Sequence, residues 1–465
     1  MTRPSRGRAP TACLVTLGCP KNEADSARLT ALLAEAGFRL TARPERADAV
    51  LVNTCGFLEI AREEARRELA RFARLKKSGR GRGRVQVLLA LGCGVEIAAS
   101  WLARRVPKLD ACVGFKDYPR IGAIARALLE GADPGEAPPG FDFEDAPRLA
   151  EGRATAYLKI AEGCDNRCAY CTIPRIRGPR RSRPIEALVA EAACLARAGV
   201  RELVLVAQDT ADYGRDLYGA PVLVDLLDAL EEVDALRWVR VMYAHPAHVD
   251  AHLIARLGRG RVVPYLDLPI QHASPRLLRR MGRRVTRSRL AEIVAALRAR
   301  EVAIRTTVIA GLPGETAREF AGLMDFLEEV RFDHLGAFVY SREPGTRAAR
   351  MSGQVRRDVA ARRRARVMRL ARRQAIERGK RLVGARVEAI VEARSSRDAA
   401  AGRTAWDAPE VDGRVRLRGR GLEEGRLLEV AITGAAGYDL EARVPPHRNA
   451  GGRGRSARRR GTARA

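Results

Sequence analysis

Three cysteines lie close together in the stretch GCDNRCAYC: Cys164, Cys168 and Cys171, here called the loop cysteines. The residues at 165–167 are polar, which favours a loop over the alternative of three buried core cysteines. A structural zinc ion needs four ligands, and no fourth cysteine or histidine is nearby. Three thiolates can instead hold three irons of a 4Fe–4S cube and leave the fourth iron open to a small molecule. The spacing therefore favours an iron–sulfur site with one open iron.

Three further cysteines each follow an apolar run that predicts a β-strand. These strand-end cysteines are Cys19 in GCPKN, Cys55 in NTCGF and Cys93 in LGCG. Because the carboxyl ends of parallel strands meet at one edge of a sheet, their side chains form one candidate site. It suits a second 4Fe–4S cluster, and the alternative is three isolated thiols. The remaining cysteines are interpreted as small buried hydrophobic side chains: Cys13, Cys112 and Cys194.

The elements around the strand-end cysteines alternate between strands and helices. Apolar runs predict three strands: 12–18, 49–54 and 85–92. Helical patterns occupy 24–37 and the charged stretch from Glu59. This order implies a parallel sheet. We therefore expect an N-terminal α/β domain over 11–130 and a linker rich in proline, glycine and acidic residues over 131–152.

Six apolar runs then alternate with helical patterns: TAYLKIAE, ELVLVAQD, LRWVRVMY, YLDLPIQ, AIRTTVIAG and HLGAFVY. Six βα units over 153–380 fit an incomplete barrel of the TIM type better than an open sheet. The loop cysteines follow its first strand, at the strand end where barrel active sites lie. Short alternating runs predict a small antiparallel β-barrel over 381–445. The stretch 446–465 has seven arginines and no acidic residue, and predicts a disordered basic tail.

Composition restricts the compartment and the partners. The chain has 465 residues and a net charge of +29, and only seven of its 85 basic residues are lysines. Such a surface favours RNA or ribosomes as partners, and a solvated arginine-rich surface without a partner is the equal alternative. The sequence has no apolar run of about 18 residues and no signal-peptide pattern, so we expect a cytoplasmic protein without membrane contact. Nine cysteines in such a chain indicate metal or redox chemistry.

The loop cysteines, with the aromatic Tyr170 before the last of them, resemble the radical S-adenosylmethionine enzymes. Over roughly residues 11–444 the chain resembles the methylthiotransferases of that superfamily, whose terminal β-barrel is a TRAM domain. Six segments resemble the ribosomal-protein branch, the RimO family: LGCPKN, VNTCGF, EGCDNRCAYCTIPRIRGPRRSRP, AQDT, PYLDLPIQHAS and DAPEVDG. The tRNA-modifying branch typically has glutamine–methionine in place of Pro20 and Lys21 and asparagine in place of Asp165.

This resemblance implies a transferase that adds a methylthio group to the β-carbon of an aspartate in ribosomal protein uS12. The implied cofactors are two 4Fe–4S clusters and S-adenosylmethionine. One S-adenosylmethionine methylates sulfur at the auxiliary cluster on the strand-end cysteines. A second is cleaved at the cluster on the loop cysteines, and the radical removes hydrogen from the aspartate. Because an unactivated C–H bond offers no acidic proton, we assign no catalytic base.

The resemblance also implies partners, and it leaves two rival functions. The partners are uS12 or the small ribosomal subunit, and a low-potential electron donor of the flavodoxin or ferredoxin type. One rival is a tRNA adenosine methylthiotransferase with the same cofactors, which the motif details oppose. The other is a non-catalytic iron–sulfur protein that binds RNA, which the open iron opposes because electron transfer alone does not need one.

Several further positions are assigned by the resemblance. Tyr170 resembles the residue that packs on the adenine of S-adenosylmethionine. Gln208 and Asp209 end a predicted strand and face either the cofactor or the barrel wall. The stretch after Cys93, GVEIAASW, lacks the arginine-rich continuation typical of the family, so Cys93 is assigned by its place at the strand end.

Three other segments carry weaker assignments. Gly311, Pro313 and Gly314 in IAGLPGET either let the backbone approach the cofactor or form a tight turn. His272 is interpreted as a hydrogen-bonded wall residue in preference to a ligand. In the terminal barrel, residues 407–413 are expected to belong to the surface that docks the ribosomal protein.

Overall fold

The computed structural model describes residues 8–76, 84–133, 135, 143–146, 148 and 152–445. The predicted linker lies largely outside these residues, and the predicted basic tail lies wholly outside them. None of the described helices is both long and apolar enough to cross a membrane.

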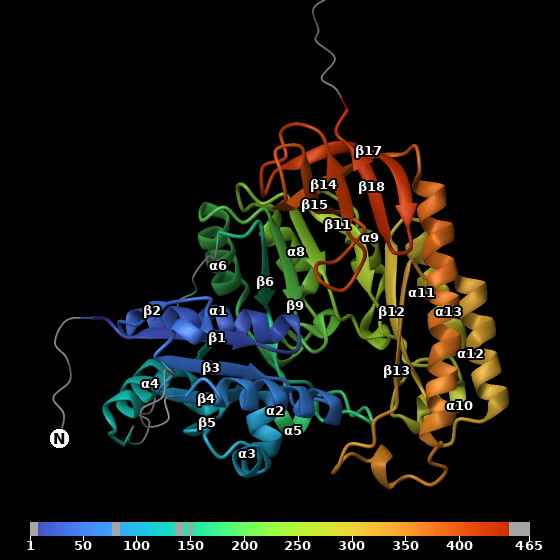
Figure 1. The fold of residues 1–465 in the computed structure, drawn as a ribbon. Helices are drawn as coiled ribbons and strands as arrows, with labels where there is room; N and C mark the ends of the chain where they lie inside the picture. Colours follow the sequence, from blue (N-terminus) through green and yellow to red (C-terminus); the bar gives the residue numbers. More distant parts are fainter. Residues whose placement is uncertain are drawn as a thin grey trace, which may run out of the picture.

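A five-stranded parallel sheet forms the N-terminal part of the molecule, at the lower left of Figure 1. In spatial order its strands are β2 (Arg39–Leu40), β1 (Thr11–Thr16), β3 (Ala49–Thr54), β4 (Val87–Gly92) and β5 (Ala111–Val113). Its helices are α1 (Pro20–Glu35), α2 (Glu59–Ala73), α3 (Cys93–Arg105) and α4 (Ile121–Glu130). Helices α1 and α4 cover one face, and α2 and α3 cover the other. The predicted parallel α/β domain is confirmed.

The strand order of this sheet positions the strand-end cysteines. The chain leaves β1 toward one face and β3 toward the other, so the order reverses between these two neighbours. Ligands of open α/β sheets bind at the carboxyl ends of the strands at such a reversal. Cys19 and Cys55 follow these two strands.

A six-stranded parallel sheet forms the centre of the molecule. Its strands are β6 (Thr155–Lys159), β9 (Glu202–Val206), β10 (Trp238–Val241), β11 (Val262–Asp267), β12 (Ala303–Ala310) and β13 (His334–Val339). They are neighbours in chain order, and β6 and β13 form its two edges. This is the arrangement of an incomplete barrel, as predicted.

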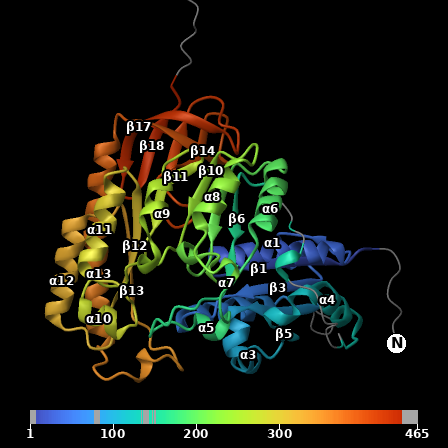
Figure 2. The ribbon, with the colours of Figure 1, turned by 180° about the vertical axis from the view of Figure 1, so that it is seen from behind.

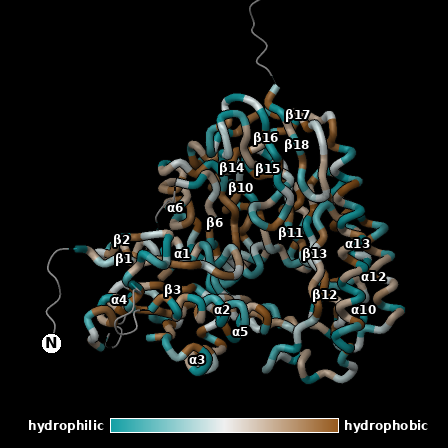
Figure 3. The backbone as a smooth tube through the Cα atoms, in the orientation of Figure 1, coloured by the Kyte–Doolittle hydropathy of each residue, from teal (hydrophilic) through white to brown (hydrophobic). Residues whose placement is uncertain are grey.

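Helices cover the outer face of this sheet, as the two opposite views show (Figures 1 and 2). The longer helices are α6 (Ile185–Arg197), α8 (Leu223–Glu231), α9 (Ala251–Arg256), α10 (Pro275–Arg280), α11 (Arg287–Arg298), α12 (Ala317–Val330) and α13 (Arg357–Leu382). The short elements are β7 (Ala161–Glu162), α5 (Ile173–Ile176), β8 (Arg181–Ser182) and α7 (Arg215–Tyr218). A large aliphatic core fills the layer between helices and strands, and hydrophobic residues follow the strands in Figure 3. Cys194 on α6 is exposed, which corrects the prediction of a buried thiol, because Leu188, Ala192 and Leu195 form the buried face of that helix.

A closed five-stranded barrel ends the described chain, at the top of Figure 1. Its strands are β14 (Arg386–Arg394), β15 (Ala399–Thr404), β16 (Val415–Arg418), β17 (Leu427–Ala436) and β18 (Asp439–Arg443). The predicted small barrel is confirmed, and four of its five pairings are antiparallel. The pairing of β16 with β18 is parallel.

The small barrel docks on the N-terminal ends of the central strands. Glu202 at the start of β9 binds Arg240 of β10 and Arg403 of β15, and all three side chains are buried. The 407–413 segment packs inward as well, so the expectation that it forms a docking surface is wrong for most of its length. Asp412 binds Arg305 and His334 and Ala408 is fully buried, which leaves exposed only the tip at 410–411.

Candidate functional site

The strand-end cysteines meet at the carboxyl edge of the N-terminal sheet. Cys19 caps α1 directly after β1, Cys55 follows β3, and Cys93 begins α3 directly after β4. Strand β3 pairs with both β1 and β4, so the three thiols come from adjacent strands. Burial raises the pKa of Cys55 to about 12, and the charges of Cys19 and Cys93 act in the same direction. The predicted convergence is therefore present.

Glycines make this close approach possible. Gly18 has a φ of +107°, and a Cβ there would lie 2.8 Å from the Cβ of Cys55. A Cβ on Gly56 would lie 2.2 Å from the carbonyl oxygen of Cys93. The glycines next to the cysteines are thus required by the packing of the three turns against one another.

The loop cysteines lie in a separate turn between the first barrel strand and α5. The backbone N–H of Ile173 donates to Cys171 Sγ over 3.4 Å, and Arg283 Nη1 lies 3.7 Å from Cys168 Sγ. Burial raises the pKa of Cys164 to about 11 and that of Cys171 to about 12, and neighbouring loop cysteines contribute to both. As free thiols, Cys164 and Cys171 therefore hold their protons at neutral pH, and metal binding would release them.

The spacing of the sulfur atoms fits a cluster better than a single ion. Among the described residues, two sets of three ligating side chains have all their ligand atoms within 4.8 Å of one another, and neither set contains a cysteine. Tetrahedral zinc, with Zn–S bonds of about 2.3 Å, would place its sulfurs about 3.8 Å apart. Three thiolates spread more widely, with N–H donors aimed at the sulfurs, form a donor set that fits an iron–sulfur cluster.

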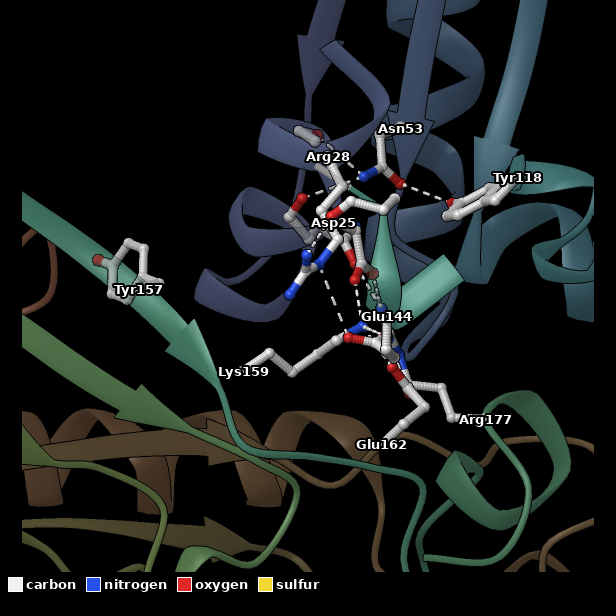
Figure 4. A network of polar contacts seen from close by, with 12 residues as sticks. Asp25, Arg28, Asn53, Tyr118, Glu144, Tyr157, Lys159, Glu162 and Arg177 are labelled. Atoms are coloured by element: carbon white, nitrogen blue, oxygen red, sulfur yellow. Dashed lines mark hydrogen bonds and ion pairs between the residues drawn. The ribbon is translucent and has the colours of Figure 1, made fainter. Parts of the chain in front are cut away.

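Arg177, from the segment that follows the loop cysteines, lies beside Asp25 of the N-terminal domain (Figure 4). It lies six residues after Cys171, and its Nε donates to Cys93 Sγ over 3.3 Å. Its Nη1 is 2.8 Å from both carboxylate oxygens of Glu162, and its Nη2 reaches Asn22 and Asp25 of α1 at 2.8 and 3.0 Å. The guanidinium is buried, so one side chain from the barrel contacts a ligand position of the N-terminal site.

A wider ionic network surrounds this contact. Lys159 of β6 binds Asp25, Glu144 and Glu162, and Arg28 of α1 binds Glu191 of α6 over 2.7 Å. These charges are buried, and each has partners of opposite sign, which offsets the cost of removing it from water. The network fixes the N-terminal domain against the edge of the barrel at β6.

The predicted cofactor-contact residues lie around the loop cysteines. Tyr170 is beside Cys168, and its hydroxyl accepts a hydrogen bond from Arg283 over 3.2 Å. Asp209 accepts from Asn166 of the cysteine loop over 2.6 Å and lies 2.7 Å from the Nδ1 of His248. Asp209 thus holds the loop in place, and Gln208 next to it is half-buried. Their contact with S-adenosylmethionine stays a prediction.

The glycine turn after β12 makes tight backbone contacts. Gly311 N–H donates to Glu315 over 2.7 Å, and a Cβ at Gly311 would lie 2.4 Å from Ala360 of α13. Gly314 N–H donates to the carbonyl of Gly353 over 2.6 Å, and Pro313 between the two glycines is buried. These contacts account for the glycines as a tight turn, and their cofactor contact also stays a prediction.

His272 is buried, as a wall residue would be. Its Nδ1 accepts from the N–H groups of Ala273 and Ser274 at 3.0 and 2.9 Å. Burial lowers its pKa to about 4, so the ring is neutral at physiological pH.

Four buried side chains of this region had no role predicted from the sequence: Lys21, Arg177, Asp267 and Arg283. Lys21 and Arg177 stand inside the motifs GCPKN and IPRIRGP. A lysine or arginine inside a cysteine motif was the available signal. Asp267 stands inside the segment PYLDLPIQHAS, and only Arg283 had no such signal, because its proximity to the site depends on the barrel.

Replacing Asp267 with asparagine is expected to stabilise the protein at pH 8 by up to about 3 kcal/mol. Burial raises the pKa of Asp267 to about 6 from an ordinary value of 3.8, although Arg305 opposes the shift. The ionised carboxylate therefore destabilises the fold: the penalty is absent below pH 3.8, grows up to pH 6 and stays constant above it. Thermal unfolding of the wild type and of Asp267→Asn at pH 4.5 and pH 8 measures this difference in stability. A difference in melting temperature that is equal at the two pH values would contradict it.

Comparison with known proteins defines the family. Family models match at 11–114 (uncharacterized protein family UPF0004), 158–327 (radical SAM superfamily) and 383–444 (TRAM domain). A protein of Anaeromyxobacter sp. (strain K) is 46% identical over 442 residues, which cover 92% of each chain. One from Pelotomaculum thermopropionicum is 43% identical over 437 residues, covering 92% of this chain and 97% of its own. Both are named ribosomal protein uS12 methylthiotransferase RimO.

The chain belongs to the RimO family. This confirms the resemblance drawn from the six sequence segments and disfavours the tRNA branch. The boundaries of the domains within this RimO family member, at residues 130, 153, 380 and 445, stay predictions.

Solved structures support the fold. The radical S-adenosylmethionine methyltransferase TsrM from Kitasatospora setae, with cobalamin and a [4Fe-4S] cluster bound, aligns with a TM-score of 0.53. The alignment covers 73% of this chain and 77% of TsrM at 16% sequence identity. At this identity the likeness concerns the fold alone.

Proposed function

We propose that this chain is a radical S-adenosylmethionine methylthiotransferase that modifies the β-carbon of an aspartate in ribosomal protein uS12. Membership of the RimO family supports the reaction and the substrate. The observation that carries the proposal is the pair of three-cysteine sites, one on the N-terminal sheet and one on the barrel, with Arg177 of the barrel in contact with Cys93 of the first site. The tRNA alternative would use the same two sites, and it is disfavoured because the similar proteins are named RimO.

The two sites take different roles in this proposal. The loop cysteines hold the 4Fe–4S cluster that binds S-adenosylmethionine, and the strand-end cysteines hold the auxiliary cluster. When bound, the first cluster and S-adenosylmethionine supply the one-electron chemistry that breaks an unactivated C–H bond. Ile173 and Arg283 donate toward the loop sulfurs, and Arg177 donates toward Cys93. These donors offset thiolate charge in a region that the docked N-terminal domain keeps from water.

We assign the remaining partners by chemistry. Tyr170, Gln208, Asp209 and the turn at 311–314 stay the proposed S-adenosylmethionine contacts. The electron donor is a flavodoxin or ferredoxin type of protein. The RNA contact expected from charge is assigned to α13, which carries exposed basic side chains without a salt bridge among the described residues: Arg357, Arg364, Arg366, Arg369, Arg372, Lys380 and Arg381.

The deciding experiment is the intact mass of uS12 from cells with and without this gene. A gene-dependent increase by one methylthio group, localised to an aspartate, is expected. An unchanged uS12 mass would overturn the proposed substrate, and the nucleosides of hydrolysed tRNA from the same strains would then test the tRNA branch.

Substitutions within each cysteine set are expected to separate the two sites. The reconstituted wild-type protein should hold about eight irons per chain in two cubic clusters. Cys168→Ser should hold about four irons and lose reductive cleavage of S-adenosylmethionine, whereas Cys55→Ser should hold about four irons, retain cleavage and lose methylthiolation. Cys194→Ser, at the exposed cysteine on α6, is the matched control and should leave all three readouts unchanged. Wild-type protein without reductive cleavage under anaerobic reducing conditions would contradict the radical mechanism.

A further inference from the structure

Lys21 carries a buried positive charge across the boundary between the two domains. It is the second residue of α1, two positions after Cys19, and its side chain is buried. Its Nζ donates to the carbonyl oxygen of Ala207 over 3.3 Å and lies 3.6 Å from the centre of the Tyr243 ring. Both partners belong to the barrel, so the ammonium group leaves its own domain.

The groups around the ammonium lie at the carboxyl ends of three adjacent barrel strands. Ala207 directly follows β9, Tyr243 follows β10, and Asp267 ends β11. Two residues beyond Ala207, Asp209 binds the loop that carries the loop cysteines. The ammonium therefore lies between the two cysteine sites, at the barrel end where substrates bind.

The described residues do not satisfy this ammonium group. The ammonium group has three hydrogens to donate. The described residues offer it only one hydrogen-bond acceptor and one aromatic ring. No described carboxylate lies within the 4.0 Å that defines a salt bridge to Nζ. Cys19, Asp267 and Glu162 act on it only from greater distances, and the Asp267 carboxylate also faces Arg305 at 3.9 Å. A buried ammonium without an ion-pair partner is costly unless an anion arrives to pair with it.

We propose that the ammonium group of Lys21 binds the side-chain carboxylate of the substrate aspartate. The inference rests on the proposed function, which supplies an aspartate as the modified residue. In that residue the β-carbon is bonded directly to the carboxyl carbon. An ion pair with Lys21 therefore fixes the carboxylate of the substrate, and the reacting β-carbon is one bond away from it. This places the β-carbon between the loop cysteines and the strand-end cysteines. The ion pair also makes Lys21 a specificity-determining residue, because an uncharged target leaves the ammonium unpaired.

Lys21 could alternatively serve only to dock the domains, through Ala207 and Tyr243. Two substitutions separate these roles. Lys21→Gln removes the charge but keeps a side-chain amide that can donate to Ala207, whereas Lys21→Met removes both. Arg28→Gln is the matched control: it neutralises another buried cation of α1 that binds the barrel helix α6, away from the cysteine sites.

The experiment is a double-mutant cycle on binding, without turnover. Reconstituted holoenzyme with S-adenosylmethionine, but without reductant, is titrated with fluorescently labelled uS12 that carries either the target aspartate or asparagine. Wild type and Arg28→Gln are expected to prefer the aspartate form by about 30-fold, the cost of breaking a buried charge pair. Lys21→Gln and Lys21→Met are expected to bind both forms equally.

A preference for the aspartate form that survives in Lys21→Gln would overturn the inference and leave Lys21 a docking residue. The same conclusion holds if wild type modifies uS12 in the mass assay but binds both forms equally. If wild type neither binds nor modifies uS12, the proposed function fails and the inference fails with it. The mass assay therefore separates the two failures. Should Lys21→Met not fold, Lys21→Gln alone decides.

Discussion

Replacing Arg177 with methionine is expected to destabilise the protein by about 3–5 kcal/mol and to lower its iron content from about eight to about four per chain. The guanidinium binds Glu162, Asp25 and Asn22 and donates to Cys93 Sγ. Methionine leaves Glu162 without one of its two cations and Cys93 without its donor. Because the contact lies at a proposed ligand of the auxiliary cluster, the irons of that cluster should be the ones lost.

Thermal unfolding and iron analysis of the reconstituted protein measure both effects. Arg177→Lys is the matched control: it keeps the charge but lacks the planar fork, so it should recover part of the stability and little of the iron. Reductive cleavage of S-adenosylmethionine at the loop cysteines should persist in both variants. Full iron content in Arg177→Met would show that the contact with Cys93 is not needed to form the site.

Replacing Glu202 with glutamine is expected to cost about 3–5 kcal/mol of stability, because it leaves the buried Arg240 without an ion-pair partner and Arg403 with Glu392 alone. Glu202 binds Arg240 over 2.8 Å and also binds Arg403, and none of the three side chains is exposed by more than 1%. Burial opposes ionisation of Glu202, but Arg403 and Arg240 outweigh it and lower its pKa to about 2. The stabilisation is therefore complete above pH 4.5 and is lost as the pH falls toward 2. Between pH 6 and pH 8 the loss in Glu202→Gln should be constant.

The matched control for this substitution is Glu392→Gln. Glu392 also binds Arg403, over 2.6 Å, but its side chain is 27% exposed. Its replacement should cost no more than about 1 kcal/mol. Thermal unfolding at pH 7, together with limited proteolysis of the small barrel, gives the loss of stability for Glu202→Gln and for Glu392→Gln. Equal losses for the two variants would mean that burial of the triad does not determine its contribution.

The architecture could be predicted because it depends on local patterns. Strand β3 covers the predicted 49–54 segment, since a short continuous apolar run is typical of a parallel strand covered on both faces. Convergence of the strand-end cysteines followed from the same logic, because parallel strands end at one edge. The parallel pairing of β16 with β18 had no such signal, since it depends on how the small barrel closes.

Contacts between domains could not be predicted from local patterns. Lys21 and Ala207 are 186 residues apart in the chain, and Arg177 and Cys93 are 84 apart. The 407–413 segment was assigned to a docking surface by the family resemblance alone. Its aspartates are buried because Arg305, His334 and Arg378 neutralise them. Partners of this kind are visible only once the domains are placed together.

The contact between Arg177 and Cys93 also sets an order for the maturation of the protein. During synthesis the three strand-end cysteines leave the ribosome before residue 177 does. The nascent N-terminal sheet can therefore fold while its thiols are still without this donor and are open to solvent. The region around Cys93 is completed only when the start of the barrel has emerged and docked. Iron delivered earlier would meet an unfinished site, so insertion at the N-terminal cysteines should follow, and never precede, assembly of the two domains.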